Sequence, residues 1–137
     1  MKLIKRIAAV AAAMVMATSM MMTSASALSG SKTTSGIARI NGYTSLSSDG
    51  KIGYAYGMGY NLTGVNRLVY VQATIYGYDG STVESHTRTT TNTTVVSSGT
   101  ISRSTTNTRY SVESIAVYNG TVEQSGQYGG ASVQVYF

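Results

Sequence analysis

The residue types that acid–base or nucleophilic chemistry needs are scarce in this 137-residue chain. It has one histidine, His86, and five acids, which are Asp49, Asp79, Glu84, Glu113 and Glu123. A serine nucleophile would need His86 as its base, but His86 lies in an exposed-looking polar segment without a Gly-x-Ser-x-Gly turn. Glu84 and Glu123 are the pair that glycoside cleavage would use, yet each follows a turn, where a charge on a solvated strand is ordinary. We therefore expect a protein that is not an enzyme.

The same scarcity argues against metals and cofactors. The chain contains no cysteine, which excludes disulfides, thiolate zinc sites and iron–sulfur clusters. Asp49 and Asp79 each precede a glycine, and this arrangement is better explained by turn chemistry than by metal ligation. No Asp-x-Asp-x-Asp pattern suggests a calcium loop. We expect no metal and no cofactor.

The N-terminal segment has the pattern of a secretory leader. Lys2, Lys5 and Arg6 precede an apolar run over residues 7–22, and Ala25-Ser26-Ala27 supplies a small-residue cleavage site. A retained anchor is the alternative, but about 16 apolar residues fall short of the roughly 20 that a membrane-spanning helix needs. We expect cleavage after Ala27, secretion to the extracellular space, and no transmembrane segment in the mature chain. The short lysine-rich leader is typical of bacteria.

The mature chain, residues 28–137, has the length of a single domain, and residues 28–35 are expected to be flexible. Three basic residues lie in the leader, so its removal lowers the formal net charge from +5 to +2. A strongly basic groove is the usual mark of nucleic-acid binding. This small charge, spread along the chain, predicts no nucleic-acid partner.

Alternating residues predict an all-β fold. Val69, Val71, Ala73 and Ile75 point one way while Tyr70, Gln72, Thr74 and Tyr76 point the other; Val112, Ala116 and Tyr118 share a face, and Ala131, Val133, Val135 and Phe137 form the inward side of a closing strand. The expected strands cover residues 36–46, 51–60, 67–78, 82–96, 100–104, 109–118, 121–126 and 130–137. Seven to eight strands in 110 residues predict a small antiparallel β-sandwich, immunoglobulin-like or jelly-roll-like.

Hairpin signals support this arrangement. Asp49-Gly50, Asp79-Gly80 and Asn119-Gly120 are all dipeptides that favour tight turns between strands. The segment at 78–84 is echoed at 118–123, which suggests either a duplicated hairpin or chance convergence.

Tyrosine is the feature that most suggests a function. Tyr54 and Tyr56 share a strand face whose other side is Gly and Ala, so they are either core residues or an exposed aromatic platform. Stronger candidates for exposure are Tyr70, Tyr76 and Tyr78. The opposite face of their strand is aliphatic, so that face is expected to be the buried one. Exposed tyrosine suits stacking on sugars or anchoring a protein, although cross-strand tyrosine pairs also stabilise sheets that bind nothing.

Threonines at 87, 89, 91 and 93 line one face of an extended segment. Such ladders occur on ice-binding surfaces in stacked copies, and a single ladder is better explained as a solvated edge strand. Proline in an edge strand hinders pairing with another chain, and this chain contains no proline. The strand at 100–104 or the C-terminal strand is therefore a candidate for pairing between chains.

We expect a secreted binding domain that recognises an extracellular glycan or protein surface through Tyr54, Tyr56, Tyr70, Tyr76 and Tyr78. The leader followed by a Gly-, Ser-, Thr- and Tyr-rich domain also resembles, loosely, the small secreted bacteriocin-like sandwiches of bacteria. That resemblance implies an antimicrobial polypeptide acting on the cell envelope as the alternative.

Overall fold

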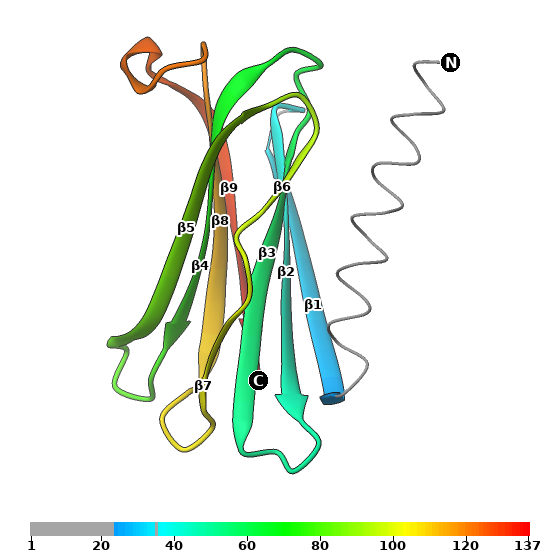
Figure 1. The fold of residues 1–137 in the computed structure, drawn as a ribbon, viewed down its shortest axis with the longest axis vertical. Helices are drawn as coiled ribbons and strands as arrows, with labels where there is room; N and C mark the ends of the chain where they lie inside the picture. The colour runs from blue at the N-terminus through cyan, green and yellow to red at the C-terminus, as the bar shows by residue number, and fades with distance from the viewer. Residues whose placement is uncertain (1–23, 35) are drawn as a thin grey trace.

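The strands form two antiparallel sheets that pack face to face. The computed structural model describes residues 24–34 and 36–137, and its elements are β1 (Ser24–Thr34), β2 (Ala38–Ser47), β3 (Ile52–Asn61), β4 (Arg67–Tyr76), β5 (Thr82–Asn92), β6 (Val95–Ser97), β7 (Ile101–Ser104), β8 (Tyr110–Tyr118), the 3₁₀ helix η1 (Glu123–Ser125) and β9 (Gln127–Tyr136). The first sheet has the order β1-β2-β3-β6, with β7 also paired to β3, and the second has the order β5-β4-β8-β9 (Figure 1). The predicted small antiparallel sandwich is confirmed.

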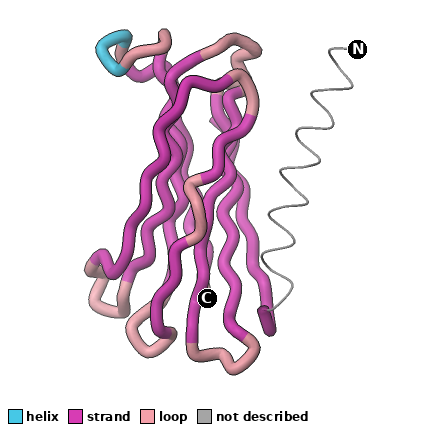
Figure 2. Tube along the Cα trace, viewed as in Figure 1, coloured by secondary structure: helices cyan, strands magenta, loops and turns pink. Residues whose placement is uncertain are grey.

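Strand dominates the described chain, and the one short helix lies in the connection between β8 and β9 (Figure 2). No described helix has the length and apolar content to cross a membrane.

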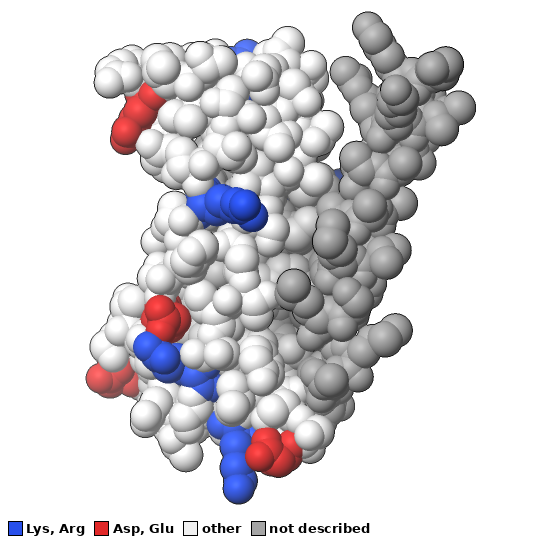
Figure 3. Space-filling model, viewed as in Figure 1, with Lys and Arg blue, Asp and Glu red and all other residues white. Residues whose placement is uncertain are grey.

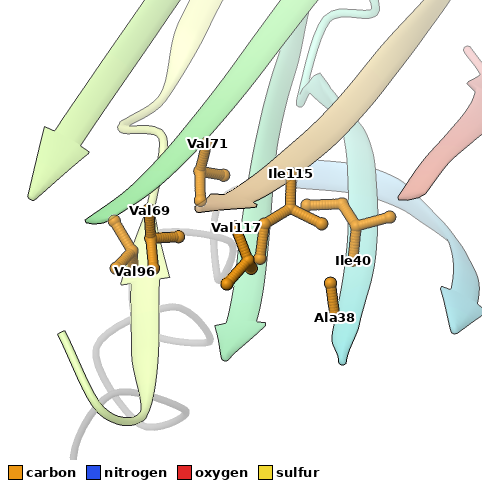
Figure 4. Close-up of a cluster of buried hydrophobic side chains, with 7 residues drawn as sticks. All are labelled: Ala38, Ile40, Val69, Val71, Val96, Ile115 and Val117. Atoms are coloured by element: carbon orange, nitrogen blue, oxygen red, sulfur yellow. The ribbon is translucent and has the colours of Figure 1, made fainter. Parts of the chain in front are cut away.

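The inward faces of the strands supply the core. On β4, Val69, Val71, Ala73 and Ile75 are all 0% exposed, as their alternation predicted. One cluster of buried side chains joins both sheets and comprises Ala38, Ile40, Val69, Val71, Val96, Ile115 and Val117 (Figure 4). Because β-branched side chains pack well on a pleated surface, this cluster gives a disulfide-free domain a continuous apolar interior.

Glycine lets the two sheets approach closely along β3. A Cβ added at Gly59 would lie 2.5 Å from Val71 on the second sheet, and one at Gly53 would lie 2.6 Å from Phe137. Both distances are shorter than nonbonded carbon–carbon contacts in proteins, so a side chain at either position would clash with the second sheet. The small-residue face of β3 therefore contacts the opposite sheet, and the Tyr54–Tyr56 face points away from the core.

Two of the three predicted hairpin turns form as expected. Gly50 and Gly80 have φ of 70° and 79°, a region that glycine enters without steric cost. Asp79 accepts hydrogen bonds from both the backbone and the hydroxyl of Ser81, and these bonds lower the pKa of its carboxyl. Asp79 thus acts as a turn residue.

The third turn and the strand after it are corrections. Residues 121–126, predicted as a strand, form a turn and η1, and the glycine with positive φ in this connection is Gly126 rather than Gly120. The echo between 78–84 and 118–123 therefore does not produce two equivalent hairpins. The Ser125 hydroxyl accepts a hydrogen bond from the Gly120 N–H and donates one to the Val122 carbonyl oxygen, and these bonds hold this connection in its folded-back shape.

The structure also refines the assignment of faces on β8. The inward positions are Ser111, Glu113, Ile115 and Val117, whereas Val112, Ala116 and Tyr118 share the outward face. Both faces of this strand carry apolar side chains, so alternation alone did not identify the buried one.

The N-terminal strand lies where a flexible segment was expected. Residues 28–34 form most of β1, which pairs with β2 from Ser24↔Ser47 to Thr34↔Ala38. The predicted leader falls largely on residues 1–23, outside the described residues. Cleavage after Ala27 stays a prediction, and it would remove the first four residues of β1.

Sheet edges fall close to the expected places. The threonine-bearing β5 is an edge strand of the second sheet, with Thr87, Thr89 and Thr91 exposed. Strand β9 forms the other edge of that sheet, and β7 pairs only with β3. Pairing between chains through these edges stays a prediction.

Candidate functional site

The five tyrosines proposed from the sequence lie on different surfaces. Tyr70 and Tyr76 are half-buried on the outer face of the second sheet, and Tyr78, in the turn between β4 and β5, is 67% exposed. Tyr54 and Tyr56 lie on the outer face of the first sheet. The five residues therefore do not form one site, and the outer face of each sheet has to be considered separately.

The outer face of the second sheet carries a row of three tyrosines. Tyr76 of β4 pairs in register with Tyr110 of β8, which pairs in turn with Tyr136 of β9. The Tyr76 and Tyr110 rings stack with centroids 5.1 Å apart, and the Tyr110 and Tyr136 rings are tilted with centroids 5.9 Å apart. We call this row the tyrosine ladder. Tyr136, its outermost member, is 52% exposed.

The ladder presents ring edges and hydroxyl groups more than flat ring faces. Near-parallel rings at about the spacing of neighbouring strands must stack against each other. Tyr136 is the member with a free side, because β9 is the edge of the sheet. Its hydroxyl accepts a hydrogen bond of 2.8 Å from the side-chain amide of Gln134.

A second aromatic pair lies at the other end of the same face. The rings of Tyr70 and Tyr118 are 5.1 Å apart and tilted by 52°. The Tyr70 hydroxyl donates a hydrogen bond to the Glu123 carboxylate, which raises the pKa of Tyr70. Tyr76 lies six positions after Tyr70 on β4, a distance of about 20 Å at 3.3 Å per strand residue.

Only uncharged side chains lie between the two aromatic groups. The Gln72 amide donates to the Ser85 hydroxyl at 3.0 Å, and the Thr74 and Ser85 hydroxyls are 3.1 Å apart. The strand register places the remaining outward positions beside them, namely Thr87, Thr89 and Thr91 on β5, Val112, Ser114 and Ala116 on β8, and Gly130, Ser132 and Gln134 on β9.

Charge is confined to the opposite face of these four strands. Their charged residues are Arg67, Glu84, Arg88 and Glu113, and all of them occupy positions in register with the inward-facing residues of β4 and β8. The outward positions contain no Asp, Glu, Lys or Arg. Figure 3 shows that most of the Lys, Arg, Asp and Glu side chains visible from that side lie in the lower half of the molecule. The strand positions on the outer face of the second sheet, from the tyrosine ladder to Tyr70, thus form a surface without charged side chains, which we call the neutral face; the Glu123 carboxylate borders it at the Tyr70 end.

The end of the sandwich next to the ladder contains a shallow hollow of about 520 Å³. It lies between the β4–β5 turn and the loop before β8, and its lining residues are Gly77, Tyr78, Asp79, Ser81, Thr82, Val83, Thr106 and Asn107. Tyr78 belongs to this hollow and not to the ladder.

The outer face of the first sheet is different in character. Tyr56, Met58 and Tyr60 form a buried cluster there with Tyr43 and Val95 packed against it. The Tyr43 and Tyr56 rings stack at 4.8 Å, and burial, together with neighbouring tyrosines, raises the pKa of Tyr56 to about 12. Tyr56 is only 6% exposed, so it is a packed residue rather than an open contact surface.

The residues considered for catalysis do not converge. Glu84 forms an ion pair with Arg103, whereas Glu123, at the other end of the sheet, accepts the Tyr70 hydroxyl. The His86 ring is hydrogen-bonded to the carbonyl oxygen of Ser98. Within residues 24–34 and 36–137, no three His, Asp or Glu side chains gather closely enough to hold a metal ion.

Sequence reasoning missed Tyr110, Tyr118 and Tyr136. The signal for Tyr136 was present, because Phe137 was expected to face inward and its neighbour must then face outward. No local signal identified Tyr110 as the partner of Tyr76, since that pairing depends on β4 and β8 being neighbours in the sheet.

The comparisons with known proteins show no family. A scan against protein-family models finds no match to this chain, and a search of curated proteins finds none either.

Solved structures show distant likeness. The chain is similar to part of a penta-heme cytochrome c552 from Thermochromatium tepidum, with a TM-score of 0.42 and 7% identity over 67% of this chain and 38% of the other. It is also similar to part of a β-glucuronidase from Bacteroides uniformis, with a TM-score of 0.37 and 11% identity over 81% of this chain and 13% of the other. Neither likeness is close enough to carry over an activity.

Proposed function

We propose that this protein is a secreted, non-enzymatic binding module that holds a neutral glycan against the neutral face of its second sheet. The observation that carries the proposal is the segregation of charge. The four strands place all their charged side chains on one face, and on the other they place mainly Tyr, Thr, Ser and Gln, with Val112, Ala116 and Gly130 among them. Because sugar rings offer apolar faces and hydroxyl groups, tyrosine rings and uncharged hydrogen-bonding groups suit them.

The absence of charge on the neutral face distinguishes between ligand classes. Nucleic acids and anionic polysaccharides bind surfaces rich in Lys and Arg, and the neutral face has neither. A typical protein interface combines an apolar centre with charged side chains at its rim. A neutral glycan therefore fits the neutral face better than a nucleic acid, an anionic polysaccharide or a protein surface.

The tyrosine ladder is pre-organised for binding. The contacts of the Tyr110 ring, stacked on Tyr76 and tilted against Tyr136, restrict the rings before a ligand binds, so less side-chain entropy is lost on binding. The ladder and the Tyr70–Tyr118 pair are about 20 Å apart along the strands. A ligand that touches both must be an extended chain of sugar rings lying along the strands.

Two further features support the remaining parts of the proposal. The leader pattern at residues 1–27 supports secretion. Each of the groups considered for catalysis has a separate partner, namely Glu84 with Arg103, His86 with Ser98 and Glu123 with Tyr70, which supports a non-enzymatic role.

The proposal is tested by measuring binding of purified protein to an array of neutral and charged glycans, followed by calorimetry with oligosaccharides of increasing length. We expect binding to neutral chains that tightens with length, and a loss of at least tenfold in affinity for Tyr136→Ala. Tyr54→Ala, on the outer face of the first sheet, is the matched control and should leave the affinity unchanged.

Three results would contradict the proposal. One is the absence of binding to any neutral glycan, and another is preferential binding to anionic chains. The third is growth inhibition of indicator bacteria by residues 28–137 without glycan binding, which would favour the antimicrobial alternative.

A further inference from the structure

Glu113 is a fully buried carboxylic acid near the middle of β8. Its side chain is 0% exposed and faces the first sheet. Neither carboxyl oxygen has a hydrogen-bond partner among the described residues. An ionised carboxylate in this place would lose its hydration and gain only a smaller stabilisation from Ser111 and the backbone.

Two glycines provide the space that the Glu113 side chain occupies. Gly42 of β2 and Gly57 of β3 lie opposite each other in the first sheet. A Cβ added at Gly42 would collide with the Glu113 Oε2 atom, and one at Gly57 would lie 3.1 Å from the Cβ and Cγ atoms of Glu113. The packing of the two sheets is thus shaped around this acid.

Among the residues that the structure describes, no charged group offsets the burial of Glu113. The side chains and glycines around it are Ile40 and Gly42 on β2, Gly57 on β3, Ala73 on β4, Val133 on β9, and Ser111 and Ile115 on β8 itself. None of these residues is titratable. Burial raises the pKa of Glu113 to about 8, and the smaller opposing effect comes from Ser111 and from the backbone.

We propose that Glu113 is a proton-operated switch within the sandwich. Folding takes up one proton from solvent onto this carboxyl group, and loss of that proton in alkaline solution destabilises the contact between β8 and the β2–β3 pair. An apolar side chain of similar size would fill the same space without sensitivity to pH. The carboxyl group therefore adds pH dependence rather than stability. This inference does not depend on the proposed glycan binding.

The direction of the effect follows from linkage. In the unfolded chain Glu113 ionises around its ordinary pKa of 4.5, and in the folded protein around 8. Its contribution to stability is complete below 4.5, declines as the pH rises through the interval, and is lost above 8. Within this interval the unfolding equilibrium constant rises about tenfold per pH unit, or roughly 10³-fold in total.

The first test is chemical denaturation of the protein and of Glu113→Gln between pH 5.5 and 9. The protein should lose stability from pH 5.5 to about 8 and show little further loss up to pH 9, whereas Glu113→Gln, which cannot ionise, should not show this loss. Histidine also changes charge near neutral pH, so His86→Gln is the control and should keep the pH dependence. The proposal is overturned if Glu113→Gln shows the same pH dependence as the unchanged protein.

A second measurement needs no variant and decides the question if Glu113→Gln does not fold. The side-chain carboxyl carbons of the five acids can be followed by NMR as the pH is raised. Glu113 should titrate with a midpoint near 8. A midpoint near 4.5 would overturn the proposal.

Discussion

The carboxyl group of Glu113 occupies the space that a side chain at Gly42 would need. The two residues lie on different sheets, and a Cβ at Gly42 would also come within 2.9 Å of the Val133 Cγ1 atom. Gly42 has an ordinary strand position rather than a positive φ. Its lack of a side chain is therefore required by packing and not by backbone conformation.

Gly42→Ala should lower the free energy of unfolding by about 1–3 kcal/mol, because the added methyl group forces Glu113 and Val133 to move. Denaturant titration measures the loss. In the double variant Gly42→Ala, Glu113→Ala, the clash between the added methyl group and the Glu113 carboxyl group is relieved. The double variant should therefore lose less stability than the sum of the losses of the two single variants. Additive losses would show that the two residues do not compete for the same space.

Glu113→Leu should stabilise the protein at pH 8 by several kcal/mol, since the unfolded wild-type carboxyl is ionised there and its burial requires a proton. The pKa of Glu113 is higher in the folded protein than in the unfolded chain, so the free energy of unfolding of the wild-type protein increases as the pH falls toward 4.5. The advantage of the leucine variant should therefore shrink at pH 5. Thermal unfolding at both pH values checks this, and an equal gain at the two would contradict it.

Tyr110→Ala should destabilise the second sheet by about 1–2 kcal/mol, because the Tyr110 ring stacks on Tyr76 and makes a tilted contact with Tyr136. Tyr110→Phe keeps the ring and removes only the hydroxyl, so its stability should stay close to that of the unchanged protein. If the hydroxyl contacts a glycan, the phenylalanine variant should bind more weakly while unfolding normally. Equal glycan affinity for the phenylalanine variant and the unchanged protein would limit Tyr110 to a structural role.

Glu123→Gln should lower the pKa of Tyr70. The Glu123 carboxylate accepts the phenolic hydrogen and so favours the neutral form of Tyr70. Replacing the carboxylate with an amide removes most of that preference. Ultraviolet titration of tyrosine ionisation measures the change, with Tyr128→Phe as a control that leaves the Tyr70–Glu123 contact in place. An unchanged Tyr70 pKa would show that the contact does not persist in solution.

The secreted protein should begin at Leu28 and fold without residues 24–27. Those residues form the first part of β1, and they pair with β2 at Ser24↔Ser47 and Ala27↔Ser45. The remaining pairs, from Leu28 to Thr34, are enough to keep β1 in the sheet. Intact-mass measurement of the exported protein identifies its N-terminus, and retention of residues 1–27 would contradict the prediction.

Most of the fold was predictable because its signals are local. The alternation from Val69 to Tyr76 identified both faces of β4, and the glycines after Asp49 and Asp79 identified two turns. The prediction failed where local signals were ambiguous. β8 has apolar residues on both faces, and a shift of one residue in the alternation exchanges the two faces of a strand. Residues 121–126 were predicted as a strand because they follow the Asn119-Gly120 dipeptide and echo the hairpin at 78–84, yet hydrogen bonds made by Ser125 fold this connection back.

The candidate site was predictable only in part. Tyr70 and Tyr76 were identified as outward-facing residues, which the structure confirms. Tyr54 and Tyr56 were grouped with them by residue type, although they lie on the other sheet. The members of a ladder are contributed by strands that are distant in the sequence, so the sequence around each tyrosine does not reveal its neighbours.

The sequence by itself determined the fold class, the scarcity of reactive groups and the outward direction of Tyr70 and Tyr76. These properties follow from residue types and from a period of two, which need no knowledge of distant partners. Tertiary structure alone decided that Tyr76, Tyr110 and Tyr136 share one row and that Glu113 faces Gly42. Both results depend on which strands pair and on how the two sheets stack. That choice is made by the packing of the whole core, where every strand must bury its apolar face at once.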